Sequence, residues 1–303
     1  MAFSATDAAF EGFRLTRRAP LAIVWWGVAY VLFIGIFFAL AWGPMSTFVS
    51  AMEAIEGQSS PNPDDFMPAM GAYFSVIALA APAALLFSAV LNAAVARAVI
   101  HPEQKAFGYL RLGGDELRVL AVSIVLGIVF FIACLVPFVV GAGLIGVGAQ
   151  GGNGGAVAGG VLVILATGLG ILALAVKLSL AIPITVAEKR IAIFDSWKMT
   201  KGKFWPMVGM TLIAFVLSVV VSLLGSVIMM PITLAFGAGT NGLERAMSLG
   251  LDEALRTMAP FLVVYVVINA ILAALQLAIL YAPFAAAYLG IKGPGVKQAD
   301  TFA

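Results

Sequence analysis

The stretch from Glu188 to Pro206 contains five cations, four aromatic rings and two carboxylates, and it lies between two long apolar runs. Lysine and arginine pair with the phosphates of anionic lipids, and aromatic rings favour the depth of the lipid headgroups. The pattern therefore predicts binding chemistry at a membrane surface, on a short elbow helix that turns the chain back into the bilayer. Gly202 predicts the end of this helix, and Pro206 predicts the first turn of the next one.

The candidate residues for binding lipid headgroups or other anions are basic or aromatic and lie in or beside an apolar run. They are Lys177, Arg14, Arg17, Arg18, Arg111, Lys189, Arg190, Lys198, Lys201, Lys203, Trp197 and Trp205. Two interpretations of these cations stay open. They recognise anionic lipid, or they only orient the membrane spans and anchor the protein.

Lys177 is the one charged residue that the sequence places inside a predicted span. Charge within a bilayer is costly and commonly marks a functional position. Along a straight helix, Glu188 would lie about 16 Å further on, which would put Lys177 near the middle of the bilayer. A kink near Pro183 would instead let the ammonium group reach the interface. Lys177 is therefore either a structural lysine or a contact for a lipid phosphate or a substrate.

The composition sets the class of protein that must position these side chains. The chain has 303 residues, of which 62% are apolar and 11% are charged. A soluble domain averages about 45–50% apolar and about 25% charged residues. Six apolar runs can each cross a hydrocarbon core of about 30 Å: Leu21–Trp42, Met70–Ala96, Val119–Val140, Gly160–Ala187, Met207–Ala235 and Phe261–Leu289. The sequence thus predicts an all-α polytopic membrane protein with six transmembrane helices in a single transmembrane domain, residues 1–303.

Charge distribution predicts the orientation of these spans. Fourteen of the 17 Lys and Arg residues lie before the first span, after the last, or in the connections that follow the second and fourth. Basic connections stay on the cytoplasmic side of a membrane. We therefore expect a multi-pass protein of a bacterial cytoplasmic (inner) membrane with both termini in the cytoplasm.

A short basic motif recurs in front of each odd-numbered span. Phe10, Phe107 and Phe194 are each followed three residues later by an apolar residue and then by a cation. Recurrence at equivalent positions predicts internal repeats. We expect three units of an elbow helix plus a hairpin, at about residues 1–98, 99–187 and 188–291, and a short cytoplasmic tail at 292–303.

The third unit resembles a known family. The segments Lys177–Pro183 and Ser196–Trp205, with Glu188 between them, are similar to a pattern in bacterial six-span proteins. These proteins resemble the membrane domain fused to some glycerophosphoryl diester phosphodiesterases, and the family usually has arginine where this chain has Lys177. The resemblance implies a cytoplasmic-membrane protein of lipid or envelope upkeep. It does not imply phosphodiesterase activity, which belongs to a separate soluble domain.

Catalytic and metal chemistry are not expected. One cysteine, Cys134, and one histidine, His101, cannot form the usual nitrogen and sulfur metal site. The chain also offers no Ser/His/Asp set and no pair of carboxylates within a span. The sequence therefore predicts a protein that is not an enzyme and has no cofactor. Its predicted partners are anionic membrane lipids or other membrane proteins, and not nucleic acid, because the basic surface would face the bilayer.

The alternative function is transport of a small solute or a lipid. Proline falls within five of the six predicted spans, and broken helices are how many transporters build their sites. The residues are Pro82, Pro137, Pro183, Pro231 and Pro283. A transporter should have a polar cavity that reaches Lys177, whereas kinks that serve only packing would leave an apolar interior.

Overall fold

The protein is built from long helices, and its computed structural model describes residues 4–56, 58, 62–237 and 251–293. Within these ranges, six helical segments are long and apolar enough to cross a membrane. The long helices are α3 (Pro20–Glu56), α4 (Met67–Ile100), α5 (Gly114–Gln150), α6 (Gly154–Leu178), α9 (Phe204–Gly237) and α11 (Leu251–Lys292). The short ones are α1 (Ala5–Ala9), α2 (Glu11–Arg18), η1 (Pro63–Phe66), η2 (Ala106–Tyr109), α7 (Ala181–Glu188) and α8 (Ile193–Met199). The predicted all-α polytopic membrane fold is confirmed.

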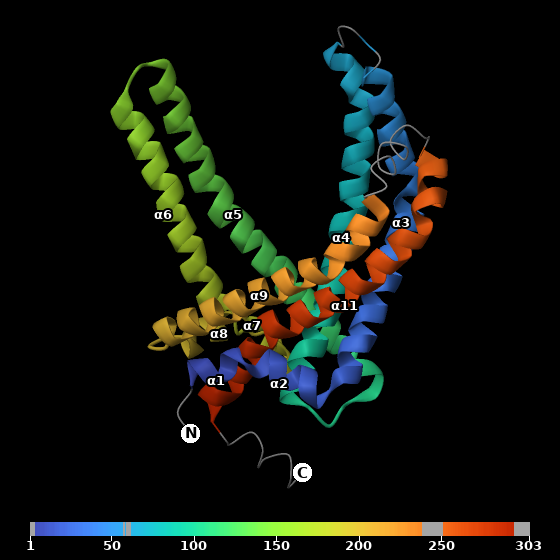
Figure 1. Cartoon of the computed structure of the whole chain (residues 1–303). Helices are drawn as coiled ribbons and strands as arrows, with labels where there is room; N and C mark the ends of the chain where they lie inside the picture. The colour runs from blue at the N-terminus through green and yellow to red at the C-terminus, as the bar shows by residue number, and fades with distance from the viewer. Residues whose placement is uncertain (1–3, 57, 59–61, 238–250, 294–303) are drawn as a thin grey trace.

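The short helices α1, α2, α7 and α8, the η2 turn and the last turns of α11 gather at one end of the molecule, which we call the elbow end (Figure 1). From there the hairpins α3–α4 and α5–α6 diverge, and α9 and α11 lie across their bases (Figure 1). Helix α11 packs against α2, α3, α4 and α9. It therefore joins the first hairpin to the third.

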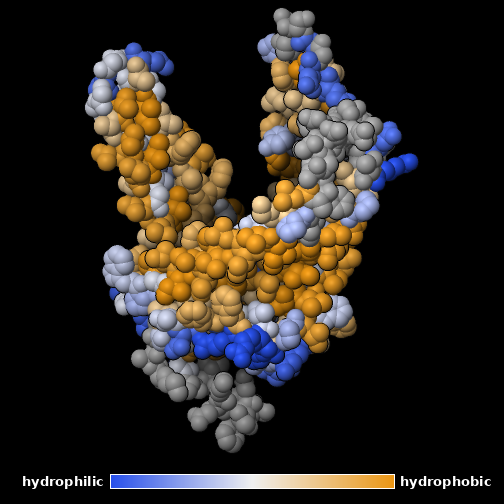
Figure 2. Space-filling view, viewed as in Figure 1, coloured by the Kyte–Doolittle hydropathy of each residue, from blue (hydrophilic) through white to orange (hydrophobic). Residues whose placement is uncertain are grey.

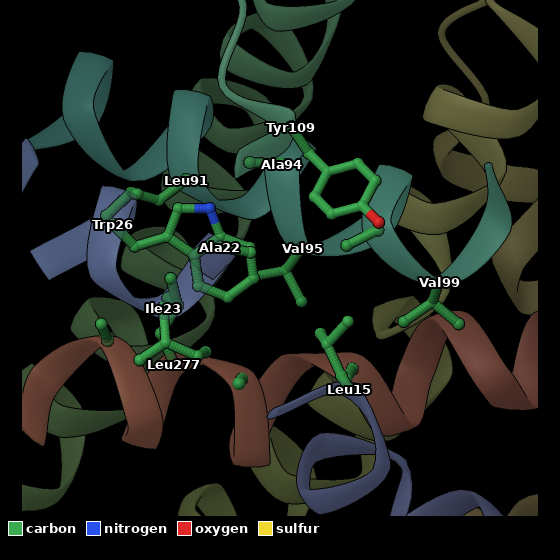
Figure 3. Close-up of a cluster of buried hydrophobic side chains, with 14 of the residues drawn as sticks. Leu15, Ala22, Ile23, Trp26, Leu91, Ala94, Val95, Val99, Tyr109 and Leu277 are labelled. Carbon is green, nitrogen blue, oxygen red and sulfur yellow. The ribbon is translucent and has the colours of Figure 1, made fainter. Parts of the chain in front are cut away.

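The core lies at the elbow end. Trp26 of α3, Leu15 of α2 and Tyr109 are fully buried, and they pack with Leu91 of α4 and with alanines of α11 (Figure 3). Small residues allow backbones to approach closely inside a membrane. A Cβ atom on Gly12 would lie 2.5 Å from the Ile279 Cα, so α2 rests directly on the backbone of α11. The elbow end is thus a packed scaffold from which the hairpins project.

The hairpin α5–α6 is longer than the sequence predicts. The prediction leaves a connection between Val140 and Gly160, but α5 continues to Gln150 and α6 begins at Gly154, so only residues 151–153 form the turn. Backbone groups in hydrocarbon must be satisfied within the helix, so glycine does not end a helix there as it does in water. A Cβ on Gly160 would lie 2.5 Å from the carbonyl oxygen of Gly141, which shows how closely the two helices pack.

The outer surface is apolar between two polar ends. Phe131 and Leu169, on α5 and α6, are examples of large side chains that are exposed along the hairpins. Figure 2 shows hydrophilic residues along the elbow end and at the tips of the hairpins, with hydrophobic residues between them. This distribution suits a chain whose middle faces lipid.

The three predicted elbows differ in structure. Helices α1 and α2 precede the first hairpin and α8 precedes the third, but a left-handed turn precedes the second. In this turn Phe107, Gly108 and Tyr109 have φ values of 49°, 65° and 65°. The elbow of the second unit is therefore the short η2 turn and not a regular helix, and the internal repeat of the sequence stays a prediction.

Candidate functional site

Helix α8 docks beneath a break between α6 and α7. Helix α6 ends at Leu178 and α7 begins at Ala181. The buried Ser196 hydroxyl donates to the Lys177 carbonyl at 2.7 Å and accepts from the Leu180 N–H at 3.1 Å. One side chain of α8 thus satisfies two backbone groups at the break.

The ammonium group of Lys177 lies over the ring of Trp197, 3.9 Å from its centroid. Lys177 belongs to the last turn of α6 and is half-buried, so it lies beside the elbow and not in the middle of a straight span. A cation over an indole face gains about 0.5–1 kcal/mol when exposed and about 2 kcal/mol when desolvated. Of the two sequence-based placements of Lys177, the structure has the one in which the helix breaks near Pro183.

Five of the predicted residues of this elbow form a largely exposed surface, here called the α8 patch, in which Lys203 is half-buried. Its members are Trp197, Lys198, Lys201, Lys203 and Trp205. Trp205 is 78% exposed, and Lys198 is also exposed, with Asp195 at 3.9 Å as a distant partner. Lys201 and Lys203 form no ion pair with a described carboxylate. Gly202 ends the elbow with a φ of 76° and Pro206 lies in the first turn of α9, as predicted. The patch thus presents largely unneutralised cations beside an exposed indole.

The arginines of α2 are more neutralised. Arg14 and Arg18 both pair with Glu11, at 3.1 and 3.5 Å, and Arg18 also donates to the Ala98 carbonyl. Arg14 donates in addition to the Asp7 carbonyl. Arg17 is exposed and has no carboxylate partner among the described residues. Of the predicted trio, Arg17 is therefore the cation most available to an external anion.

The end of α7 carries a cluster of charges that holds three elements together. Glu188 accepts from Lys292 of α11 at 2.9 Å and from Arg190 at 2.6 Å. Arg190 also pairs with Asp195 of α8 at 2.7 Å. Hydrogen bonds to Asp195 and Glu188 raise the pKa of the Arg190 guanidinium above its usual value. Arg190 is thus engaged within the protein, whereas the neighbouring Lys189 is exposed and has no ion pair with a described residue.

A buried ion pair was not predicted. Arg97 of α4 is 2% exposed and donates to the Glu116 carboxylate of α5 at 2.5 Å and to the Tyr109 carbonyl at 2.5 Å. The sequence assigned Arg97 to a basic loop because the apolar run ends just before it. Arg97 and Glu116 are 19 residues apart, so no short spacing in the sequence indicates that they pair. The one feature of the sequence that could have indicated the pair is Glu116, which lies close to the start of the third apolar run.

Arg97 also helps to position Arg111, because it anchors the turn that precedes this residue. The Trp26 indole donates to the Gly108 carbonyl at 2.7 Å, next to the bond between Arg97 and Tyr109. A Cβ at Gly108 would lie 2.7 Å from the Trp25 Cβ, so the turn needs glycine for space as well as for its φ. Arg111 follows this anchored turn, is exposed, and forms no ion pair with the carboxylates that the structure describes.

Two hollows bear on the transport alternative. A cavity of about 360 Å³ at the break between α6 and α7 is lined mainly by apolar side chains, and Lys177 is not among them. A second hollow of about 560 Å³ lies between α9 and α11 and is more polar. Its polar lining comprises Ser222, Ser226, Thr233, Tyr265, Asn269 and Gln276. The polar groups therefore gather away from Lys177.

Comparisons with known proteins identify no relative. No family model, no curated protein and no solved structure matches the chain. The resemblance to the membrane domain of glycerophosphoryl diester phosphodiesterases stays a prediction. Over the described residues, no group of three or more His, Cys, Asp or Glu side chains is arranged to hold a metal ion.

Proposed function

We propose that the protein is a non-enzymatic integral protein of a bacterial cytoplasmic membrane that engages anionic lipid, or an acidic surface of a partner membrane protein, through the α8 patch. This role would serve upkeep of the membrane or envelope. The observation that carries the proposal is the contrast among the cations. Arg14, Arg18 and Arg190 pair with carboxylates, whereas Lys201 and Lys203 have no such partner among the described residues. Arg17, Arg111 and Lys189 also lack one, but the α8 patch combines two such lysines with the exposed Trp205 that follows them.

The chemistry of the patch supports a lipid headgroup as the ligand. A cation near an anionic membrane surface contributes about 1 kcal/mol, and indoles favour the same depth. Lys203 immediately precedes α9 and Trp205 lies in its first turn, where the chain turns toward the apolar part of the molecule. Lipid phosphates at that depth would meet the cations while the indoles contact the upper acyl chains.

The test is the lipid shell that the protein retains when it is extracted into polymer discs with its surrounding membrane. We expect anionic lipid to be enriched over the membrane average, and we expect the triple variant Lys198→Gln, Lys201→Gln and Lys203→Gln to lose most of this enrichment. Arg256→Gln, which removes an exposed cation from the first turns of α11, is the control and should retain it. Equal enrichment in the triple variant and the wild type would contradict lipid binding by the patch.

A second candidate function, transport of a small solute, is favoured by the polar hollow between α9 and α11. Its lining has amide and hydroxyl groups but no charged side chain, which suits a neutral solute. Glycerol entry into proteoliposomes, followed by light scattering, tests this candidate. Entry should be faster than in protein-free vesicles and should slow when Asn269 and Gln276 are both replaced by leucine. The same rate with and without protein would rule against glycerol passage through the hollow.

A further inference from the structure

An apolar groove runs along the first hairpin and is lined by α3, α4 and the segment before α5. Its volume is about 760 Å³, and fourteen residues line it. Six belong to α3 between Ala29 and Leu40, five belong to α4 between Leu79 and Val90, and the remaining three are residues 110–112. Arg111 is the one polar or charged residue among them. The groove is thus a hydrocarbon surface with a single cation at one end.

The dimensions of the groove match one leaflet of a bilayer. Ala29 and Leu40 are separated by about 16 Å along α3, and half of the hydrocarbon core is about 15 Å thick. Trp25 and Phe107 pack edge to face beside the end that carries Arg111, with centroids 5.7 Å apart, and both are exposed. Aromatic rings of this kind mark headgroup depth. The groove therefore extends from the headgroup region toward the middle of the membrane.

Arg111 is held at this mouth by the buried anchor described above. The carbonyls of Gly108 and Tyr109 are fixed by Trp26 and Arg97, so the chain two residues later has little freedom. The guanidinium of Arg111 has no carboxylate partner in the described part of the chain. An arginine fork pairs with phosphate through two parallel hydrogen bonds. Charge and position together fit an anionic headgroup above an acyl chain.

A smaller hollow of about 280 Å³ adjoins the groove. It shares Leu86, Val90 and Leu112 with the groove and continues toward the start of α5. Leu112 is 89% exposed and is one of the residues that line both hollows. Glu116 lines the smaller hollow, but its carboxylate is paired with Arg97. Two adjoining apolar hollows below one cation suit the two acyl chains of a phospholipid.

We propose that the α3–α4 groove and the adjoining hollow bind one diacyl anionic phospholipid from the leaflet at the elbow end, with its phosphate on Arg111 and its chains on either side of Leu112. The inference rests on the proposed function in one respect, namely that the elbow end faces anionic lipid. It adds a defined lipid site on α3 and α4, separate from the α8 patch.

The experiment is native mass spectrometry of the full chain reconstituted in discs of equal parts phosphatidylglycerol and phosphatidylcholine. The wild type should retain one phosphatidylglycerol. Arg111→Gln should lower its retention about fivefold, the equivalent of about 1 kcal/mol, while Arg111→Lys keeps part of it. Ala83→Phe fills the groove from α4 and should lower the retention of both lipids. Lys105→Gln, in the same connection but outside the groove, should match the wild type.

The outcomes separate this site from the α8 patch. Retention unchanged in both Arg111→Gln and Ala83→Phe overturns the groove site, whatever the triple lysine variant does. A loss in Arg111→Gln with full retention in Ala83→Phe also overturns it, because the headgroup would then bind without its chain. Retention of a free fatty acid in place of the diacyl lipid is a third contradiction. If the groove variants lose the single lipid while the triple lysine variant keeps it, the site stands even where the α8 patch fails.

Discussion

Arg97 and Glu116 show how much the elbow end depends on individual charges. Both are buried, their ion pair is 2.5 Å long, and Arg97 also satisfies the Tyr109 carbonyl. A buried pair gains little over an apolar pair of the same size, but removing one partner leaves a desolvated charge without compensation. We therefore infer that the pair holds α4, α5 and the turn before Arg111 together.

The single variant Glu116→Leu should lower the free energy of unfolding by about 3–5 kcal/mol. The double variant Arg97→Met with Glu116→Leu should recover most of that loss, because no isolated charge remains. Thermal or denaturant unfolding in detergent micelles measures both values. Arg118→Gln, which removes a more exposed partner of Asp115, is the comparison and should cost about 1 kcal/mol or less. A double variant no more stable than Glu116→Leu would contradict this role.

Helix α8 illustrates what an element does beyond its sequence pattern. The basic and aromatic residues of the elbow predict contact with a membrane surface, whereas Ser196 fixes the helix to the rest of the protein. Its hydroxyl bonds to both sides of the break between α6 and α7. The Trp197 ring then covers the Lys177 ammonium group. The position of the α8 patch thus depends on Ser196, a buried residue that carries no charge.

Ser196→Ala should lower the free energy of unfolding by about 1–3 kcal/mol, because it leaves the Leu180 N–H and the Lys177 carbonyl without this partner. The substitution should also loosen the packing of the Trp197 side chain, and the change should be visible in the tryptophan fluorescence. Ser75→Ala is the matched control, since the exposed Ser75 bonds only to the Gly71 carbonyl of its own helix. An equal effect of the two substitutions would show that the bridge across the break is not structural.

The sequence predicts the elements better than it predicts their ends and their contacts. Apolar composition identifies all six spans, and Gly202 and Pro206 mark the end of the elbow correctly. The predicted connection after Val140 is wrong, because the helix continues to Gln150. The prediction treated the glycines after Val140 as helix breakers, as they are in water, but a helix in hydrocarbon keeps its own hydrogen bonds. The pair of Arg97 and Glu116 is absent from the prediction because long-range packing decides it. The sequence leaves two placements of Lys177 open, and only the break after Leu178 in the structure decides between them.

At the scale of the whole molecule, the charged elbows and both ends of the described chain lie together, while the hairpins α3–α4 and α5–α6 point away from them (Figure 1). The elbow end is also where the core packs. A polar end with apolar helices that project from it fits a protein that crosses the bilayer and places its charged elbows at one membrane surface. The distribution of Lys and Arg along the sequence underlies the expectation that the elbow end faces the cytoplasm.

The orientation can be tested with single cysteines in a chain in which Cys134 is replaced by alanine. A cysteine at Asn153, in the turn of the hairpin α5–α6, should react with a membrane-impermeant maleimide in intact cells. A cysteine at Lys201 should react only after the cells are permeabilised. The chain without cysteine reports background labelling. Labelling at position 201 in intact cells would contradict a cytoplasmic elbow end.

The most direct measurement of the central claim is quenching of Trp205 by brominated lipids. The contribution of Trp205 is the difference between the fluorescence of the wild type and that of Trp205→Phe, in vesicles that contain brominated phosphatidylglycerol or brominated phosphatidylcholine at the same fraction. We expect the anionic lipid to quench Trp205 several-fold more strongly, and we expect the triple variant at Lys198, Lys201 and Lys203 to remove that preference. Equal quenching by the two lipids in the wild type would contradict the assignment of the α8 patch as a surface for anionic lipid.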